Sequence, residues 1–569
     1  MPAASCPCIW RSGTDARPVR TLAESPLLRA MRSVCELAVS VLAPYAIPAP
    51  QPEGHRMPHS AHVRKEGAAR AWTAVACSLP WRLMTLPYRT AHRSSLRRAR
   101  YRRSAVGLLA CVVSAGTGAL TAGATASAAG SPAVQAWQAT QAPMPSTAAA
   151  NPLVEVRQIT CAARGECVGV ASFNNAAGVA TGVIEHLHAG TWSATSAPTP
   201  PRIAMPQRVT LTSVSCPTPV TCGVSGYLST PATRRSELLT LSRGTWTAHA
   251  APLLPGTLAD SQTLSAISCP RPGRCVAVGR YQGGAHGYFQ GLIEVQSGSA
   301  WHAVEAPLPG DTTRTADPFG GVAWISCPAA GRCMTVGAYV DNQGRRELFA
   351  DVLSRGRWHS SRLPLPSRAA ANPLAYLGYV ACHGLAHCVA GGNLTVSGGA
   401  QDGLFEREDR GRWHASAAPL PAGAAASPDA TINEVSCPAA RFCAAAGNYN
   451  DSIGAARGVL ETFSAGKWHA TTAAAPADDR TSRFMTSVSC PVANWCVAAG
   501  STNFTGLLET LARGHWTLTA APLPAPGTGA VFQGTSVSCP SPRMCAAFGS
   551  YELHGPPQTG QGLLESYSG

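Results

Sequence analysis

Charged residues are scarce in this sequence of 569 residues. Asp, Glu, Lys and Arg make up only 13% of it, and two lysines are present, Lys65 and Lys467. Coiled coils and long-helix proteins are rich in Glu, Lys and Leu, and they avoid Gly and Pro. The 13% charge, with 55 Gly and 46 Pro, therefore argues against both classes. The glycines show no three-residue period, which excludes collagen.

Long apolar runs and the common enzyme signatures are also missing. The strongest apolar run is 105–113 (AVGLLACVV), about half of the roughly 20 residues that span a bilayer. The sequence contains no G-x-S-x-G, P-loop, dinucleotide-binding or EF-hand pattern. No motif therefore assigns a reaction, and we expect neither a cofactor nor a bound metal.

The net charge of +15 is concentrated at the N-terminal end. Residues 1–128 hold 17 of the 45 basic and 5 of the 30 acidic residues, so 129–569 hold 28 basic and 25 acidic, a net of +3. We therefore expect no nucleic-acid partner for the region 129–569, because such partners require clustered basic residues.

The basic cluster 97–103, the apolar run and Ala126-Ser127-Ala128 together indicate a secretory signal peptide over 84–128. An uncleaved membrane anchor, a lipoprotein signal at Cys111 and a twin-arginine signal remain alternatives, and the membrane is expected as a partner only if the signal stays uncleaved. We expect 1–83 to be a disordered leader or a misassigned start.

The cysteines reveal an internal repeat. Of the 21 cysteines, five lie in the leader and sixteen form eight pairs, each with five residues between its members. They are Cys161/Cys167, Cys216/Cys222, Cys269/Cys275, Cys327/Cys333, Cys382/Cys388, Cys437/Cys443, Cys490/Cys496 and Cys539/Cys545. A β-branched residue always stands two before the first Cys, and Gly stands four after the second in seven units. A G-L-L-E-like segment, a turn and a Trp follow, and then a tail such as APLP.

Each unit of about 50 residues is expected to contain four short strands, because Gly, Pro and Ser bound short apolar segments at even spacing. Repetition of such a unit predicts an all-β fold, a single eight-bladed β-propeller over 129–569, with repeats at 154–569. The last unit lacks its Trp strand, and AWQATQAPMP within 133–145 matches that strand. We therefore expect the N-terminal strand to complete the last blade and close the ring, with the Cys-ending strand innermost.

The paired cysteines are expected to form one hairpin disulfide per blade. Facing positions of a hairpin bring two cysteines within bonding reach, and bridges of this kind belong to an oxidising compartment. Zinc is the alternative, but its usual ligand spacing is shorter and needs a second converging pair. In the unit Cys382–Cys388, His383 and His387 lie within the loop and would allow a metal site if the thiols were reduced.

A carboxylate recurs seven residues before the Trp of most units. These residues are Glu185, Glu294, Asp351, Glu406, Glu461 and Glu509, with Glu565 equivalent and Leu239 as the exception. A pair of carboxylates suits glycosidic acid–base chemistry. Because the same residue recurs around a repeat, we expect instead that each satisfies the same turn in its blade.

The loops between the second and third strands differ most between units, so we expect any ligand to bind there. Aromatic residues combined with Asp, Asn and His suit the recognition of sugars or peptides. The candidates are Phe173, Tyr281, His286, Tyr288, Tyr339, Asp341, Tyr449, Asp451, Tyr551 and His554. The alternative is that the repeated aromatic residue only caps a strand.

The unit VSCP-x4-C-x-A-x-G…L-L-E-x4-G-x-W…APLP resembles secreted repeat proteins of high-GC Gram-positive bacteria. These are similar to propellers of the Asp-box (BNR, sialidase-like) group. Ser242-Arg243-Gly244-Thr245-Trp246 keeps the Gly-Thr-Trp of the Asp-box turn S-x-D-x-G-x-T-W, but no unit has its Ser and Asp together. Sialidases use six blades, an arginine cluster, a Tyr nucleophile and an acid–base Asp, and no motif carries those roles here. The resemblance implies fold and export.

We therefore expect a secreted, extracellular or cell-wall-associated, monomeric propeller that binds a polysaccharide or a protein and is not an enzyme. The alternatives are a glycan-acting hydrolase at the central channel and a structural spacer. Arg, Tyr and Asp converging at the channel mouth would favour the hydrolase, and a mouth of repeated Ser and Gly would favour binding.

Overall fold

The structure, a computed structural model of the chain, describes residues 137–201, 208–231, 233–283, 287–313, 320–476, 481–503, 505–524, 532–553 and 559–568, all within the unit Ala122–Gly569. The predicted leader (1–83) and signal peptide (84–128) lie outside these residues, as does the beginning of the closing segment 133–145. Within the described ranges, no helix is long and apolar enough to cross a membrane.

The regular elements of the described chain are β-strands, and consecutive strands pair antiparallel in groups of four. The first groups are β2 (Glu155–Ala163), β3 (Glu166–Asn174), β4 (Ala180–His188) and β5 (Thr191–Ser196); β6 (Arg208–Thr218), β7 (Thr221–Ser229), β8 (Arg234–Ser242) and β9 (Thr245–Ala250); and β10 (Thr257–Ser268), β11 (Val276–Gly283), β12 (Tyr288–Ser297) and β13 (Ala300–Glu305). Single parallel pairings, Ala180 with Arg208 and Ser261 with Arg234, join these twelve strands into one sheet.

The following groups form separate four-stranded sheets. They are β14 (Gly321–Ala329), β15 (Arg332–Val340), β16 (Arg346–Ser354) and β17 (Arg357–Arg362); β18 (Tyr376–Cys382), β19 (His387–Thr395), β20 (Gln401–Asp409) and β21 (Arg412–Ala417); β22 (Thr431–Ala439), β23 (Phe442–Asn450), β24 (Ala456–Ser464) and β25 (Lys467–Thr472); and β26 (Arg483–Val492), β27 (Trp495–Thr502), β28 (Gly506–Ala512) and β29 (His515–Ala520).

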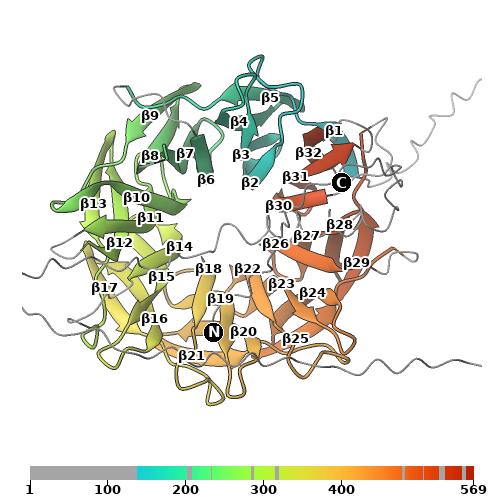
Figure 1. The fold of residues 1–569 in the computed structure, drawn as a ribbon. Coiled ribbons are helices and arrows are strands. Elements are labelled where there is room, and N and C mark those ends of the chain that lie inside the picture. The colour runs from blue at the N-terminus through green and yellow to red at the C-terminus, as the bar shows by residue number, and fades with distance from the viewer. Residues whose placement is uncertain are drawn as a thin grey trace, which may run out of the picture. The chain divides into compact units, whose positions relative to one another are not determined.

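The remaining sheet joins the two ends of the described chain. Its strands are β30 (Phe532–Ser541), β31 (Met544–Leu553), β32 (Thr559–Ser568) and β1 (Trp137–Gln141), and β1 pairs antiparallel with β32 from Trp137–Tyr567 to Gln141–Leu563. The groups follow one another in chain order about a common centre, with the first strand of each group nearest to it (Figure 1). The repeated four-stranded, propeller-like architecture predicted from the sequence is confirmed.

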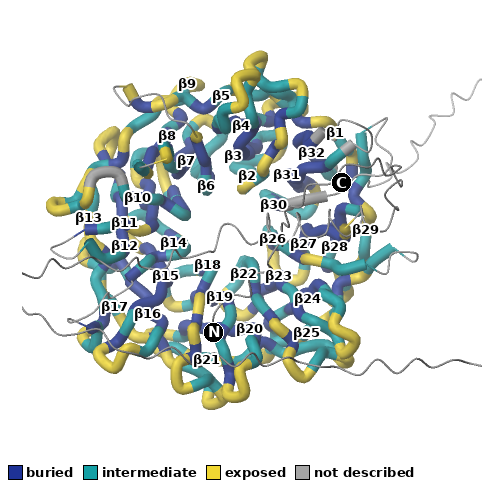
Figure 2. The backbone as a smooth tube through the Cα atoms, viewed as in Figure 1, coloured by how far each residue is buried: buried dark blue, intermediate teal, exposed yellow. Residues whose placement is uncertain are grey.

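Burial changes from strand to strand within a group (Figure 2). The second strand β3 is buried along almost its whole length, whereas the fourth strand β5 alternates between exposed and half-buried residues. A strand that is covered on both faces reads as a continuous apolar run, and an edge strand with one wet face alternates. The core therefore lies between neighbouring groups, and the Trp strands form the outer edges.

The hairpin before most Trp strands turns through an x-Gly pair, and the β12–β13 hairpin turns through Gly298-Ser299 instead. Arg243-Gly244 and Ala465-Gly466 have positive φ at both residues, 51° and 78° in the first pair and 50° and 82° in the second. Two-residue turns of this kind match the twist of the flanking strands and favour Gly at their second position. The G-x-W part of the repeat is thus a turn signal.

The glycine four residues after the second Cys has a different reason. A Cβ on Gly392 would overlap the carbonyl oxygen of Tyr376, and one on Gly447 would overlap that of Thr431. The first strand shifts register beside these glycines, between Leu377 and Tyr379 in β18. Glycine is therefore required where the bulged first strand approaches the second.

All eight predicted disulfides are formed, with Cα–Cα distances between 4.0 and 4.2 Å. Each bridge closes a short loop and contributes about 2–2.5 kcal/mol in the chain-entropy picture. Disulfides at this density indicate an oxidising compartment. The bridges are Cys161–Cys167, Cys216–Cys222, Cys269–Cys275, Cys327–Cys333, Cys382–Cys388, Cys437–Cys443, Cys490–Cys496 and Cys539–Cys545.

The second cysteine of each pair is part of the core and is at most 4% exposed. These residues are Cys167, Cys222, Cys275, Cys333, Cys388, Cys443, Cys496 and Cys545. Their sulfurs are bonded and buried, so they staple the hairpins and do not form part of an accessible binding site. In the unit Cys382–Cys388 the two sulfurs are bonded to each other, so they are not available as thiolate ligands for a metal.

A serine just before the first Cys links neighbouring groups at six of the eight repeat positions. The backbone N–H of Cys539 donates to Ser489 Oγ at 3.0 Å, and that of Cys161 donates to Ser538 Oγ at 2.9 Å. The same bond joins Cys269 to Ser215, Cys327 to Ser268, Cys382 to Ser326 and Cys490 to Ser436. The two other acceptor positions hold Thr160 and Ala381. The Ser of the VSCP motif is thus an inter-sheet acceptor.

The recurrent carboxylates do not serve turns, and this prediction was wrong. They lie in the middle of the third strands and are at most 2% exposed. Glu185, for example, stands between Gly169 of β3 and Ala194 of β5. Neither carboxylate oxygen of Glu185 or Glu406 has a partner within the described chain. Burial raises the pKa of both residues to about 9, so they are neutral acids at pH 7.

The proline-rich tails explain why Glu185 and Glu406 lack a backbone donor. Glu509 Oε1 accepts a hydrogen bond of 2.6 Å from the backbone N–H of Ala474, in the tail that follows β25. In every other tail this position is Pro, as in Pro252 and Pro419, and Pro has no N–H. The pKa of Glu509 rises only to about 7, because the Ala474 bond opposes the effect of burial.

We expect Ser489→Ala to lower the free energy of unfolding by about 1 kcal/mol, because it leaves the buried N–H of Cys539 without its acceptor. The reverse change, Ala381→Ser, supplies an acceptor beside Cys437 and should not destabilise. Urea denaturation of the disulfide-intact protein measures both. Equal stability of Ser489→Ala and wild type would contradict the structural role of the bond.

The buried acids also predict a pH dependence of stability. Their pKa values are raised in the folded state, to about 9 for Glu406 and about 8 for Glu565, against 4.5 for an ordinary Glu. The folded protein therefore holds protons that the unfolded chain releases. Stability from this source is fully present below about pH 4.5 and is lost as the pH rises towards 9.

Urea denaturation between pH 5 and 9 should show this decline. Glu406→Leu, which copies Leu239 of the second group, should make the decline shallower. A stability that increases over this range, or a slope unchanged in Glu406→Leu, would contradict the account.

Candidate functional site

The first strands converge on a pocket of about 270 Å³. We call it the central pocket; it is lined by Val156, Arg157, Gln158, Thr212, Trp324, Tyr379, Glu434, Thr486, Ser487 and Ser536. These residues come from β2, β6, β14, β18, β22, β26 and β30, strands that are far apart in the sequence. The pocket lies slightly below the 300–1,000 Å³ of drug-sized sites, a size that suits one small polar unit.

One position of the repeat supplies most of this lining. It stands three residues before the first Cys, and we call it the inner position. Its occupants are Gln158, Ser213, Ala266, Trp324, Tyr379, Glu434, Ser487 and Ser536. The first strand shifts register immediately before it, between Ile432 and Glu434 in β22 and between Met485 and Ser487 in β26. A β-bulge re-aims the side chain that follows it, here towards the centre.

The small polar occupants of the inner position have a structural role. Ser487 Oγ accepts the backbone N–H of Val537 at 3.1 Å, and Ser536 Oγ accepts that of Ile159 at 3.2 Å. Gln158 Oε1 does the same for Val214 at 2.8 Å. Together with the VSCP serines, these bonds tie each group to the next.

Trp324 and Tyr379 interrupt this series. Their rings are in contact, with centroids 4.2 Å apart and planes inclined at 42°. Both side chains are half-buried and line the central pocket. In the described chain, no side chain accepts the N–H of Val380 or Val435, the residues that would bond to serines at these two positions. An aromatic pair here forgoes the structural bond and offers an apolar face to the pocket.

Glu434 follows in the next group and adds a carboxylate. Its Oε2 accepts the backbone N–H of Val488 at 3.0 Å. Burial raises the pKa of Glu434 to about 7, and hydrogen bonds from Ser487 and Val488 oppose the rise. No cation is within ion-pair distance of Glu434 in the described part of the chain. The carboxylate of Glu434 is therefore protonated more readily than that of an ordinary Glu.

Arg157 is the one guanidinium in the pocket lining, and it already has a counter-charge. Its Nη2 lies 2.6 Å from Glu155 Oε1, and Glu155 Oε2 is also 3.2 Å from Arg208 Nη2. The lining thus combines one Arg, one Tyr and one Glu with Ser and Thr. This lining is neither the arginine cluster that would favour a hydrolase nor a mouth of repeated Ser and Gly.

The aromatic candidates of the variable loops are in the core. Phe173, Tyr281, Tyr339, Tyr449 and Tyr551 are exposed by 0–3% only. The hydroxyl of Tyr281 donates to Glu305 at 2.8 Å, and that of Tyr449 bonds to Thr472 at 2.9 Å. Each of these two Tyr residues therefore ties its second strand to the end of its own Trp strand. The role of the aromatic residues in ligand binding stays a prediction, and the rings offer no open face to a ligand in this structure.

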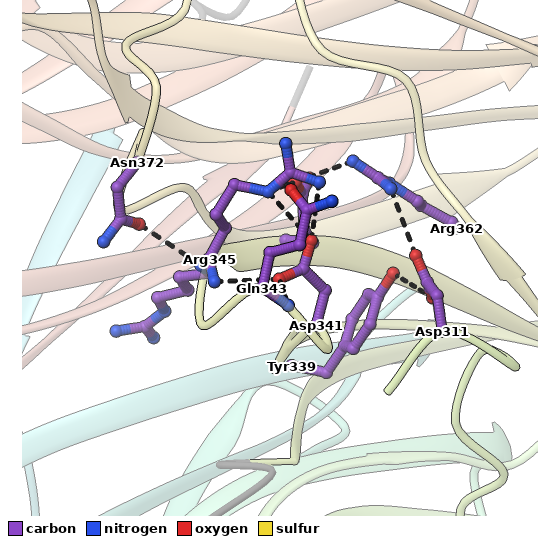
Figure 3. Close-up of polar contacts among 9 residues, drawn as sticks. Asp311, Tyr339, Asp341, Gln343, Arg345, Arg362 and Asn372 are labelled. Atoms are coloured by element: carbon purple, nitrogen blue, oxygen red, sulfur yellow. Dashed lines mark hydrogen bonds and ion pairs between the residues drawn. The ribbon is translucent and has the colours of Figure 1, made fainter. Parts of the chain in front are cut away.

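Asp341 and Asp451 shape the turns that follow the second strands, and Figure 3 shows the turn at Asp341. Asp341 Oδ1 accepts the backbone N–H groups of Gln343 and Arg345, both at 2.9 Å, and its Oδ2 accepts the Arg345 side chain. Asp451 makes the equivalent bonds to Ile453, Ala455 and Arg457. These are Asx turns, which use the carboxylate oxygens inside the loop.

The same close-up shows that the nearby charges are also paired. Arg362 lies 3.1 Å from Asp311 and 2.7 Å from Glu347, and Tyr339 donates to Asp311 at 2.8 Å. His286 and His554 lie outside the described residues. Tyr288 is half-buried at the start of β12, opposite Gly283. The structure therefore does not bring the predicted loop residues together at one site.

Sequence reasoning missed the inner position. The signal was available, because alignment of the eight units at the residue three before the first Cys shows Trp, Tyr and Glu where small polar residues recur. No group of three His, Cys, Asp or Glu side chains with a metal-binding arrangement occurs among the described residues.

Comparisons with known proteins identify no family. No protein-family model matches the chain, and no curated protein matches it. Among solved structures, a Mycobacterium tuberculosis puromycin-hydrolyzing peptidase is similar with a TM-score of 0.39 and 12% identity, over 74% of this chain and 62% of that one. A polysaccharide lyase gives 0.36 and 10%, over 61% and 88%. A Trypanosoma rangeli sialidase in complex with sialic acid gives 0.31 and 11%, over 72% and 54%.

The chain thus spans less than two thirds of the length of the peptidase and of the sialidase. These TM-scores are too low to support an argument about function.

We expect Glu434→Gln to leave stability unchanged, because an amide oxygen can accept the Val488 N–H just as Gln158 accepts that of Val214. Glu434→Ala removes the acceptor and should cost about 1–3 kcal/mol. Thermal unfolding of the two variants measures this difference. If Glu434→Gln were as unstable as Glu434→Ala, the structural role would belong to the charge and not to the acceptor.

Proposed function

We propose that the chain is a secreted, closed eight-bladed β-propeller that binds an extracellular polysaccharide at the central pocket without catalysing its cleavage. The observation that carries the proposal is the composition of that pocket. Trp324 and Tyr379 provide apolar ring surfaces beside Gln158, Glu434 and hydroxyl groups of Ser and Thr. A pyranose ring presents the complementary pattern, with an apolar face and a rim of hydroxyls.

Closure is supported by contacts between the first and last groups. β1 supplies the outer strand of the last sheet, and Ile159 and Cys161 donate to Ser536 and Ser538. A core cluster that includes Phe173 and Phe548 also spans both groups. Closure of this kind leaves no exposed terminal edge. Secretion is supported by the disulfides, which persist in oxidising compartments.

Binding is favoured over hydrolysis by the number of carboxylates. Most glycosidases use two carboxyl groups, about 5–9.5 Å apart, across the scissile bond. Within the described chain, Glu434 is the single carboxylate of the pocket lining. Polysaccharide is favoured over protein by size, because a stable protein interface buries about 800 Å² on each partner, far more than this pocket offers.

A glycan-acting hydrolase is the second candidate, and one observation favours it. The pKa of Glu434 rises to about 7 through burial, which suits a general acid, and Arg157 and Tyr379 line the same pocket. Reducing ends produced from a bound glycan would identify this activity.

A glycan array probed with the full chain, produced in an oxidising compartment, tests the proposal. We expect binding without release of reducing ends. Trp324→Ala should weaken binding at least tenfold, because it removes half of the aromatic surface. Tyr376→Ala is the control, since Tyr376 is 47% exposed on the same strand as Tyr379 and outside the pocket lining. Binding unaffected by Trp324→Ala would place the ligand elsewhere.

A further inference from the structure

Glu434 carries a charge that its structural role does not need. Its task in the repeat is to accept one backbone N–H, that of Val488. Ser487 and Ser536 perform this task with a neutral hydroxyl, and Gln158 performs it with an amide. A carboxylate adds a second acceptor oxygen and a negative charge at a half-buried place, where a charge is costly unless it is paired.

The protein itself does not neutralise this charge. Arg157 is the one cationic side chain among the described lining residues, and its guanidinium is bonded to Glu155 at 2.6 Å. An anionic ligand would meet the Glu434 carboxylate without a free guanidinium to compensate it. A neutral ligand would leave the charge as it is. A cationic group on the ligand would supply the missing counter-charge through a charge-assisted hydrogen bond.

The neighbours of Glu434 define what else the ligand carries. Tyr379 and Trp324 occupy the inner positions of the two preceding groups, so the three side chains follow one another around the pocket. Their rings suit an apolar ring face and also attract a nearby cation. Thr212, Thr486 and Ser536 add hydroxyl groups to the same lining, which suit a polyhydroxylated molecule.

Building on the proposed polysaccharide binding, we infer that the central pocket selects a sugar unit bearing a protonated amine, with Glu434 as its counter-ion and Trp324 and Tyr379 as the platform for its ring. Deacetylated amino sugars are thus the ligand class, and their N-acetylated and hydroxyl counterparts are discriminated against. The Glu434 carboxylate provides the discrimination, because the rings of Trp324 and Tyr379 would contact the amino, N-acetylated and hydroxyl sugars equally.

Isothermal titration of the full, disulfide-bonded chain at pH 7 tests this with three β-1,4-linked trisaccharides. They differ at carbon 2, which carries an amine, an N-acetyl group or a hydroxyl. We expect the amino form to bind at least tenfold more tightly than the other two. In Glu434→Gln the three should bind within about threefold of one another, and Glu166→Gln, a carboxylate change outside the pocket lining, should behave as wild type.

A second readout separates the charge from a merely structural effect. Binding of an ammonium ion favours ionised Glu434, so the wild type should release more protons on binding than Glu434→Gln, as measured in buffers of different ionisation enthalpy. Arg157 and Tyr379 are the other charged or titratable side chains of the lining, and both are retained in this comparison.

The outcomes distinguish the inference from the function on which it rests. Equal affinity for the amino and hydroxyl trisaccharides, with both weakened by Trp324→Ala, overturns the selectivity and leaves polysaccharide binding intact. Binding of spermidine, but of no trisaccharide, overturns both and assigns a general cation site. If neither spermidine nor any of the three trisaccharides binds, the amine selectivity and the proposed polysaccharide binding are both overturned.

Discussion

The arrangement of the groups depends on the backbone N–H of the first cysteine in each disulfide hairpin. This N–H makes no hydrogen bond within its own hairpin and is therefore available to the neighbouring group. Cys161 and Cys167 face each other with Cα atoms 4.0 Å apart, as in a non-hydrogen-bonded pair of an antiparallel ladder. The Cys161 N–H therefore points to the neighbouring group, where Ser538 accepts it. One short motif thus joins the covalent bridge inside a group to the hydrogen bond between groups. Each sheet is positioned by the one before it.

The outer part of each group follows a different rule. Proline suits the tails because they form no ladder, but it removes the N–H that a buried carboxylate of the next group would use. Glu509 keeps such a donor because Ala474 replaces Pro, and the pKa of Glu509 rises less than that of Glu185. The acids are thus tolerated as neutral groups. In alkaline solution the same chain is destabilised by the charge that it excludes at neutral pH.

The sequence was most informative where a pattern repeats. The spacing of Cys161 and Cys167, and the match between 133–145 and the Trp strands, predicted the disulfides and the pairing of β1 with β32. It was least informative where the same residue type can serve either the fold or a ligand site. Tyr339 and Asp341 have the composition of a ligand site, yet burial and an Asx turn account for them. Composition does not show which face of a strand a side chain occupies, and here the bulges decide that face.

The central pocket is where the inner position departs from the repeat, and the proposed binding depends on those departures. A hydroxyl at the inner position satisfies the next group, so serine is sufficient for stability at Ser487 and Ser536. Trp324 and Tyr379 lack that bond, and Glu434 retains it but adds a half-buried carboxylate. The loss of that bond at Trp324 and Tyr379 costs stability locally, and local rules of this kind are broken mainly where function requires it. Because Trp324, Tyr379 and Glu434 occupy consecutive groups, they line the pocket side by side, whereas Ser487 and Ser536 in the following groups tie those groups together.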